Sequence, residues 1–372
     1  MRAVAVALAF LALPALADWT SFRGDAAMTG VAKDPLPAVL APRWTFEAGD
    51  GFEGTAAIAG GVVYVGSLDG RLYALDLATG KERFRYAAKG EIKSSPAVDG
   101  GKVFFGDEAG TFHALDAKDG KPAWTFVADG AFTSSPTVAA DARGRKLVLV
   151  GSYDGALYAL EAATGKLAWK LETDNYVHAS PAVAGGKVYV AGCDGFLRGL
   201  KLEDGSEVVK VPLGGYTAAT PALAGSRAYL GTFENQFLAI DLAGAQVLWR
   251  YEHPERKFPF YASAALAGEV VIVGGRDKLI HALDAASGKA RWTFDTPARV
   301  ESSPVVVGGR VAVASKSGDL YLLGLADGKS QWQYATGSAL AASPAVADGW
   351  LVIGTLDGSV LAFAAEPKGA SQ

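Results

Sequence analysis

The stretch Ala74–Phe84, "ALDLATGKERF", decides the fold because it recurs along the chain. It returns as "ALDAKDGKPAW" at Ala114–Trp124, as "ALEAATGKLAW" at Ala159–Trp169 and as "ALDAASGKARW" at Ala282–Trp292. A Gly-Lys pair also occurs in phosphate-binding loops, and a repeated Asp also occurs in metal sites. The motif lacks the spacing of a P-loop, however, and its Asp is replaced by other residues in several copies. We therefore interpret it as a structural element.

A second signature, Ser or Thr usually followed by Pro, gives the length of the repeat. It occurs at Thr55, Ser95, Ser135, Ser180, Thr220, Ser263, Ser303 and Ser343, where Ala replaces Pro after Thr55 and Ser263. Successive positions are 40, 40, 45, 40, 43, 40 and 40 residues apart. Each repeat contains four short apolar segments separated by Gly-rich turns, which is the pattern of one β-propeller blade. The sequence predicts an all-β protein with a single eight-bladed propeller of four-stranded antiparallel blades.

The two ends of the repeat array complement each other. The eighth repeat ends after "GSVLAFA" (Gly358–Ala364), where its fourth strand is missing, and "RWTFEAG" (Arg43–Gly49) matches the fourth strand of other repeats. We therefore expect Trp44–Glu47 to complete the last blade, which closes the ring and removes an exposed sheet edge. This interpretation divides the chain into a leader at 18–42, a propeller at 43–366 and a tail at 367–372.

A large aromatic residue recurs eight positions after the Asp of the motif. We predict that these side chains fill the space between neighbouring blades, because a flat ring at one fixed point suits splayed sheets. The docking positions are Trp44, Phe84, Trp124, Trp169, Trp249, Trp292 and Trp332. The "TGK" segment of the motif is expected to be a tight turn in which Gly adopts a positive φ.

The first seventeen residues have the pattern of a secretory signal peptide. Arg2 precedes an apolar run at Ala3–Leu13, and Ala15–Ala17 is an A-x-A cleavage site. We expect cleavage after Ala17, no lipid anchor and an exported protein that is periplasmic or secreted. No later segment is apolar enough to cross a membrane. The net charge of −4 gives no reason to expect nucleic acid, and the single Cys193 excludes an internal disulfide.

The pattern A-x-D-x-x-T-G-K-x-x-W resembles the tryptophan-docking repeat of the pyrroloquinoline-quinone (PQQ) type β-propellers. The resemblance covers about residues 43–365, and "DWTSFRGDAAMTG" (Asp18–Gly30) resembles the leader of secreted proteins in that group. This superfamily includes the quinoprotein dehydrogenases and the outer-membrane assembly lipoprotein BamB. In size and in the shortness of its loops, the chain is most similar to BamB.

The resemblance implies a choice between an enzyme and a binding protein. The dehydrogenases hold calcium through Glu and Asn side chains, use an Asp as general base and carry adjacent cysteines beside the cofactor. Here Cys193 is alone and the repeats lack long insertions, so we expect no enzyme activity and neither PQQ nor calcium. The main hypothesis is a monomeric, BamB-like scaffold for envelope proteins, with outer-membrane assembly components among the partners. A sensor that binds a small molecule is the alternative, and the missing lipidation cysteine leaves membrane tethering open.

Candidate binding residues lie in the loops that should surround the mouth of the central channel. Two residues before each Ser/Thr, these loops carry Glu53, Lys93, Thr133, His178, Tyr261 and Glu301. Their chemistry changes from repeat to repeat, as expected of a binding surface, although ordinary solvated loops would vary as well.

The long loop His253–Ser263, "HPERKFPFYAS", is the second candidate. We predict that Arg256, Lys257, Phe258 and Phe260 contact a partner, because Arg and aromatic side chains are typical interface anchors. The alternative is that the aromatic residues of this loop cover the core beneath it.

Overall fold

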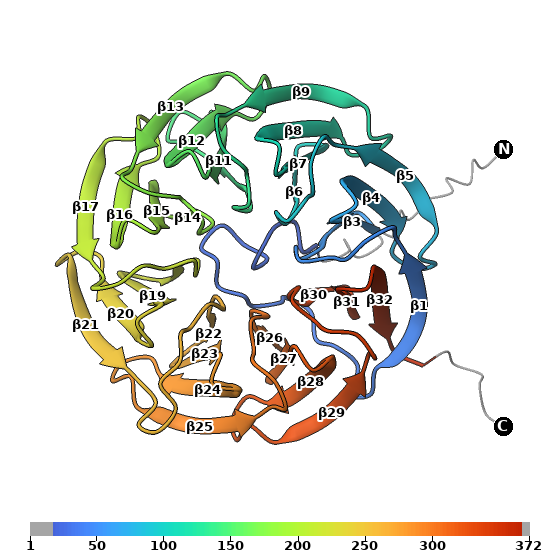
Figure 1. The fold of residues 1–372 in the computed structure, drawn as a ribbon, viewed down its shortest axis with the longest axis vertical. Coiled ribbons are helices and arrows are strands. Elements are labelled where there is room, and N and C mark those ends of the chain that lie inside the picture. Colours follow the sequence, from blue (N-terminus) through green and yellow to red (C-terminus); the bar gives the residue numbers. More distant parts are fainter. Residues whose placement is uncertain (1–17, 367–372) are drawn as a thin grey trace, which may run out of the picture.

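The computed structural model describes residues 18–366, which form strands β1 to β32 and no helix. The strands make eight four-stranded antiparallel sheets that surround a central axis like blades (Figure 1). The predicted eight-bladed, all-β propeller is therefore confirmed. Within this part of the chain, no helix could span a membrane. The expected signal peptide, its cleavage site and the tail at 367–372 lie outside the described residues.

The first four blades follow the chain, and each runs from its innermost to its outermost strand. Blade 1 contains β2 (Ala57–Ala59), β3 (Val62–Gly66), β4 (Arg71–Asp76) and β5 (Glu82–Ala87). Blade 2 contains β6 (Ala97–Asp99), β7 (Lys102–Gly106), β8 (Thr111–Asp116) and β9 (Pro122–Val127). Blade 3 contains β10 (Thr137–Ala140), β11 (Lys146–Gly151), β12 (Ala156–Glu161) and β13 (Leu167–Glu172). Blade 4 contains β14 (Ala182–Ala184), β15 (Lys187–Ala191), β16 (Phe196–Lys201) and β17 (Glu207–Pro212).

Blades 5 to 7 continue in the same way, and blade 8 takes one strand from each end of the propeller. Blade 5 contains β18 (Ala222–Ala224), β19 (Arg227–Gly231), β20 (Phe237–Asp241) and β21 (Gln246–Tyr251). Blade 6 contains β22 (Ala265–Ala267), β23 (Val270–Gly274), β24 (Leu279–Asp284) and β25 (Ala290–Asp295). Blade 7 contains β26 (Val305–Val307), β27 (Arg310–Ala314), β28 (Asp319–Gly324) and β29 (Ser330–Ala335). Blade 8 contains β30 (Ala345–Ala347), β31 (Trp350–Gly354), β32 (Ser359–Ala364) and β1 (Ala41–Glu47).

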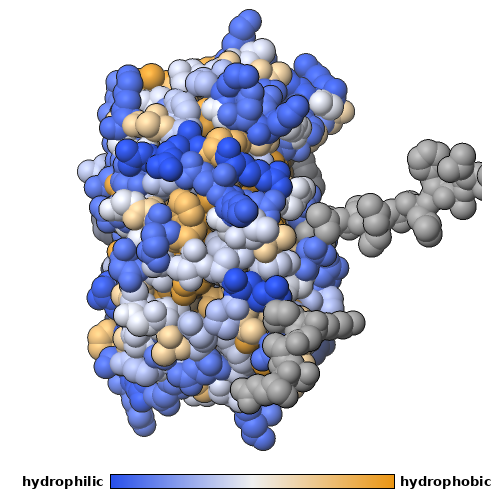
Figure 2. All heavy atoms as spheres, turned by 90° about the vertical axis from the view of Figure 1, so that its right-hand side faces the viewer, coloured by the Kyte–Doolittle hydropathy of each residue, from blue (hydrophilic) through white to orange (hydrophobic). Residues whose placement is uncertain are grey.

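Burial explains the sequence pattern of the strands. The two middle strands of a blade are covered on both faces, so β7 and β8 are almost continuously buried. The outermost strand has one face toward solvent, so β9 alternates between exposed and partly buried side chains. Figure 2 shows the outer wall around β1, where hydrophilic residues predominate and apolar patches are small and separate.

The ring closes as the sequence predicts. β1 pairs antiparallel with β32, and Trp44 lies opposite Ala362 while Phe46 lies opposite Val360. In Figure 1, β1 continues the outer circle of strands between β29 and β5. This pairing gives blade 8 its fourth strand, so the first strand of the propeller joins its last blade.

The aromatic column fastens each blade to the next. The ring of Trp169 lies against Gly205 of the following blade, and its Nε1 donates a hydrogen bond of 2.9 Å to the carbonyl of Leu202. Equivalent bonds, of 2.8 to 3.2 Å, are donated by Trp44, Trp124, Trp249, Trp292 and Trp332. Phe84 takes the same place against Gly120 without a donor. A β-bulge next to this position recurs in every blade, including blade 4, where Val209 replaces the aromatic residue. The predicted packing between blades is confirmed.

The leader closes one end of the channel. It crosses the centre of the ring in Figure 1 and bonds, through its backbone, to the innermost strands of six blades. The strand residues that donate an N–H to it are Ile58, Val98, Val183, Leu223, Leu266 and Val306. Arg23 is fully buried in this segment and donates to the carbonyls of Ala264 and Pro304. Burial lowers its pKa to about 9, so the guanidinium remains charged at neutral pH.

Candidate functional site at the channel mouth

The loops that enter the innermost strands meet at the end of the channel opposite to the leader. They surround a cavity of about 390 Å³. All six residues predicted from these loops line it: Glu53, Lys93, Thr133, His178, Tyr261 and Glu301. Ala218 and Ala341 take the corresponding positions in the two other loops. The structure therefore brings the predicted residues together around one cavity, and their part in binding is a proposal developed below.

The neck of the cavity is a ring of hydroxyl groups from the Ser/Thr signature. All eight line the cavity and all are buried: Thr55, Ser95, Ser135, Ser180, Thr220, Ser263, Ser303 and Ser343. In seven cases, the backbone N–H of one of these residues donates to the hydroxyl oxygen of the next blade, at 2.8 to 3.0 Å. The signature thus links neighbouring blades around the channel. The sequence revealed its period but not this hydrogen-bond ring.

The floor of the cavity comes from the leader. The partly buried side chain of Phe22 lines the cavity, while the adjacent Arg23 lies within the protein. Sequence reasoning missed Phe22, because the leader occurs once and no repeat shows how it aligns with the blades.

A second set of mouth residues comes from the turns between the second and third strands of the blades. Glu108 and Tyr153 line the cavity from these turns. They lie two residues after the Gly that ends the second strand, at Gly106 and Gly151. The residue at this position varies from repeat to repeat, as it does in the first set. Alignment of the repeats could therefore have identified Glu108 and Tyr153 as candidate mouth residues.

Charged pairs occupy one part of the mouth. Lys93 lies 3.1 Å from a carboxylate oxygen of Glu91 and 3.6 Å from one of Glu108. Burial opposes the charge of Lys93, but its bond to Glu91 and the charge of Glu108 raise its pKa above the ordinary value. Glu53 has no ion-pair partner among the described residues.

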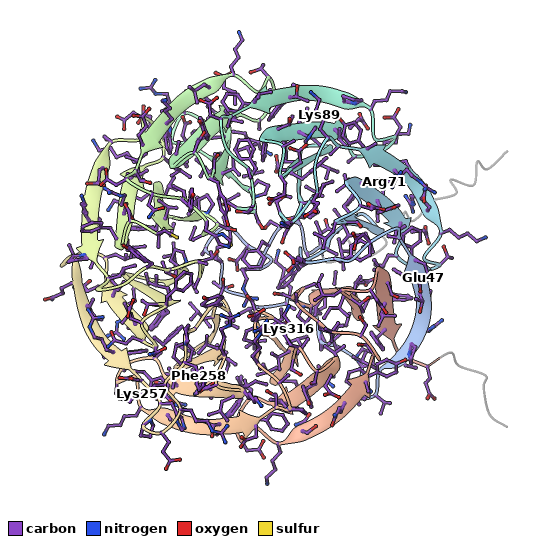
Figure 3. All side chains as sticks on the ribbon, in the orientation of Figure 1. Glu47, Arg71, Lys89, Lys257, Phe258 and Lys316 are labelled. Atoms are coloured by element: carbon purple, nitrogen blue, oxygen red, sulfur yellow. The ribbon has the colours of Figure 1, made fainter. Side chains whose placement is uncertain are left out.

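Glu301 is surrounded by cations. Its carboxylate lies 2.7 Å from Arg276, 3.1 Å from Arg299 and 3.4 Å from Lys316. The guanidinium of Arg276 also lies over the ring of Tyr261, at 4.2 Å from its centroid. Figure 3 shows Lys316 close to the centre of the ring. The negative charge of Glu301 is thus neutralised by the protein itself.

Aromatic side chains occupy the opposite part of the mouth. The Tyr153 hydroxyl lies 2.6 Å from Nδ1 of His178, and the ring of Tyr176 stacks on Tyr153 at 4.8 Å. Burial lowers the pKa of His178 and raises that of Tyr153, so both groups are neutral at neutral pH. The Tyr153 hydroxyl and the imidazole thus form a hydrogen bond between two neutral groups. His113 and His281, by contrast, are buried.

The predicted partner loop has a mixed outcome. Phe258 is 51% exposed, and in Figure 3 it lies with Lys257 nearer the outer strands than the channel. Arg256 pairs with Asp295 at 2.7 Å. The prediction that Phe260 contacts a partner is wrong, because its side chain is 1% exposed and packs in the core. Phe260 occupies the same repeat position as the buried Phe52 and Phe132, which indicated its place in the core.

The residues of the mouth do not fit a calcium and quinone site. No group of three or more His, Cys, Asp or Glu side chains that could hold a metal ion occurs within residues 18–366. Glu301 is engaged by three cations. The remaining lining carboxylates, Glu53 and Glu108, would repel an anionic quinone. Cys193 has no second thiol beside it, and burial raises its pKa.

Comparisons with known proteins identify the fold and the family. A family model described as outer membrane protein assembly factor BamB matches residues 41–147, 131–257, 199–279 and 259–367. BamB from Moraxella catarrhalis is 18% identical, with a TM-score of 0.74 over 88% of this chain and 100% of that one. Quinohemoprotein alcohol dehydrogenase from Comamonas testosteroni is 14% identical, with a TM-score of 0.80 over 96% of this chain and 82% of that one.

A computationally designed protein, Ika8, is also similar, with 16% identity and a TM-score of 0.75 over 86% of this chain and 98% of that one. No curated protein sequence matches the chain. At such identities these structures show the fold alone, and the fold occurs both in an assembly factor and in enzymes. The family model, in contrast, covers nearly the whole propeller, so the chain belongs to the PQQ-like propeller family described as outer membrane protein assembly factor BamB.

Proposed function

We propose that the protein is an exported, non-catalytic propeller that acts as a monomeric scaffold for protein partners in the bacterial envelope. The observation that carries this proposal is the position of its exposed aromatic side chains. Tyr176, Tyr216 and Phe258 are each more than half exposed, and they lie in the loops that enter blades 4, 5 and 6. Three consecutive loops thus present large aromatic side chains at the mouth end of the propeller.

The chemistry of this aromatic surface (Tyr176, Tyr216 and Phe258) fits a protein interface. Aromatic and Arg side chains are enriched at the energetic centres of interfaces. Arg256 and Lys257 lie beside Phe258 and add positive charge at one edge. The leader closes the opposite end of the channel, and the outer wall seen in Figure 2 is mainly hydrophilic. The mouth end is therefore the best candidate for partner contact, and outer-membrane assembly components are the partners that the family suggests.

The test is affinity capture of cross-linked partners from bacterial envelope extracts, with identification by mass spectrometry. We expect outer-membrane assembly components to be captured, and we expect their loss when Tyr176, Tyr216 and Phe258 are all changed to Ser. The matched control changes three exposed side chains of outermost strands to Ser: Val127, Val208 and Leu248. Equal loss with both triple variants, or no capture of assembly components by the unaltered protein, would contradict the proposal.

The non-catalytic part of the proposal rests on the donor chemistry of the mouth, where Glu301 is neutralised and the thiol of Cys193 stands alone. We expect no dye-linked alcohol oxidation after incubation with PQQ and calcium. Export rests on the pattern of residues 1–17, and the mature protein is expected to begin at Asp18, which N-terminal sequencing would verify.

A sensor that binds a small molecule is the second candidate function. It is favoured by the size of the cavity, whose volume of about 390 Å³ lies within the usual range of ligand pockets.

A further inference from the structure

The hydroxyl ring at the neck of the cavity carries unused hydrogen-bond donors. Seven of its oxygens accept backbone N–H groups, but none of the eight hydroxyl groups donates a hydrogen bond to another group of the described chain. All eight side chains are at least nine-tenths buried and line the cavity. A buried O–H group without an acceptor is costly, so these donors require acceptors from whatever fills the cavity.

The rim of the cavity carries the opposite chemistry. Oε1 of Glu108 is buried and has no hydrogen-bond partner, and the same holds for Oγ1 of Thr133. Glu53 also lines the cavity without an ion-pair partner among residues 18–366. An ionised carboxylate only accepts hydrogen bonds. A ligand that fills the cavity must therefore accept hydrogen bonds near the neck and donate them near the rim.

The floor and the net charge narrow the class of ligand. The floor is the aromatic ring of Phe22, which suits a ligand with an apolar face. Three carboxylates line the cavity. That of Glu301 is neutralised by the cations around it, and that of Glu108 lies beside Lys93, so Glu53 leaves one negative charge without an ion-pair partner among the described residues. This charge opposes an anion, while the hydroxyl donors of the neck offer nothing specific to a cation.

We propose that the channel-mouth cavity binds a neutral saccharide of one or two rings. Each sugar hydroxyl both donates and accepts, so one ligand satisfies the neck hydroxyls and the rim carboxylates together. The carbon face of a sugar ring packs against Phe22. The cavity volume of about 390 Å³ accommodates a ligand of this size. This inference rests on the proposed non-catalytic binding role of the mouth and adds the chemical class of the ligand.

The test is isothermal titration calorimetry on the full-length mature protein at millimolar ligand concentration. Millimolar concentrations are far below the molar range in which sugars stabilise proteins through their exclusion from the protein surface, so this non-specific effect does not contribute. The neutral probes are glucose, galactose, maltose and cellobiose, with glucuronate as the anionic probe and spermidine as the cationic probe. We expect saturable binding of at least one neutral sugar and no binding of glucuronate or spermidine. Failure of all four sugars to bind, or binding of only glucuronate or spermidine, would overturn the proposal.

A matched pair of variants assigns the binding to the cavity. Glu91 and Glu108 both pair with Lys93, but only Glu108 lines the cavity, while Glu91 is exposed. Glu108→Gln is expected to weaken sugar binding about tenfold, since a hydrogen bond to a charged group is lost. Glu91→Gln should leave the affinity unchanged. Equal weakening by both variants, with folding verified by circular dichroism, would refute the cavity as the site.

The outcomes for the two proposals are separable. Capture of assembly components and saturable sugar binding by the unaltered protein would support both. Intact partner capture with no sugar binding would refute the ligand class alone, and sugar binding without any partner capture would refute the scaffold function alone.

Discussion

The contact between Trp169 and Gly205 offers a quantitative test of how the blades are held together. Trp169 is 8% exposed, and a Trp side chain buries about 200 Å², which at about 25 cal/mol per Å² is worth about 5 kcal/mol. In Trp169→Ala the remaining Cβ keeps a small part of that buried area, and the carbonyl of Leu202 loses its hydrogen-bond donor. We therefore expect this substitution to lower the free energy of unfolding by about 4 kcal/mol.

Gly205→Ala tests the same contact from the other side. Gly205 has a φ of +75°, and a Cβ there would lie 2.6 Å from the Trp169 ring. The left-handed backbone costs about 1 kcal/mol and the overlap about 2 kcal/mol more. In the double variant the overlap is absent, so the two substitutions should together cost about 2 kcal/mol less than their sum.

The assay is urea unfolding followed by far-ultraviolet circular dichroism, which does not depend on the fluorescence of Trp169. Gly186→Ala is the control, because Gly186 has a φ of +71° and open space where a Cβ would stand. It should cost about 1 kcal/mol in both backgrounds. The reasoning fails if Gly205→Ala costs no more than Gly186→Ala, or if the costs of Trp169→Ala and Gly205→Ala simply add.

Three further predictions concern ring closure, acid stability and the leader. Removal of the residues up to Glu47 leaves β32 without its partner, so the melting temperature should fall sharply, and an unchanged value would refute closure by β1. Burial lowers the pKa of His178, so on acidification toward about pH 5 the unfolded chain takes up a proton before the folded protein does, and stability falls. His178→Gln should show a smaller loss of melting temperature over that range, and an equal loss would contradict the reasoning. Gly30→Ala places a Cβ against the Arg23 guanidinium at a φ of +67°. It should therefore lower the free energy of unfolding by about 2 kcal/mol or more and expose the leader to proteolysis. A leader that resists protease as well as that of the unaltered protein would argue against this contact.

The repeated positions made most of the fold predictable from sequence. A docking Trp such as Trp169 has the same neighbours in every blade, so alignment of the repeats reveals its role without coordinates. The match between Arg43–Gly49 and the outer strands of other repeats likewise predicted the pairing of β1 with β32. Repetition works here because each copy of the motif reports on the same physical environment.

The candidate site was only partly predictable, because its contacts cross from one repeat to another. His178 was predicted at the mouth, but its partner Tyr153 lies in the preceding blade and belongs to a different repeat position. The loop around Phe260 has the composition of an interface, whereas its repeat position, shared with the buried Phe52 and Phe132, places it in the core. Phe22 belongs to a segment that occurs once, so nothing in the sequence related it to the channel.

The geometry of the mouth separates what holds the ring together from what can select a ligand. The neck presents nearly the same hydroxyl group from every blade, and a ring of equal donors cannot by itself orient a bound molecule. Orientation has to come from the rim, where Glu108 faces the cavity from blade 2 and the Tyr153–His178 pair spans blades 3 and 4. Because the neck hydroxyls also accept backbone N–H groups between blades, their removal should reduce stability together with binding. Substitutions at the rim should instead change the choice of ligand at nearly constant stability, since the charged and aromatic pairs there lie at the surface of a ring that is already closed.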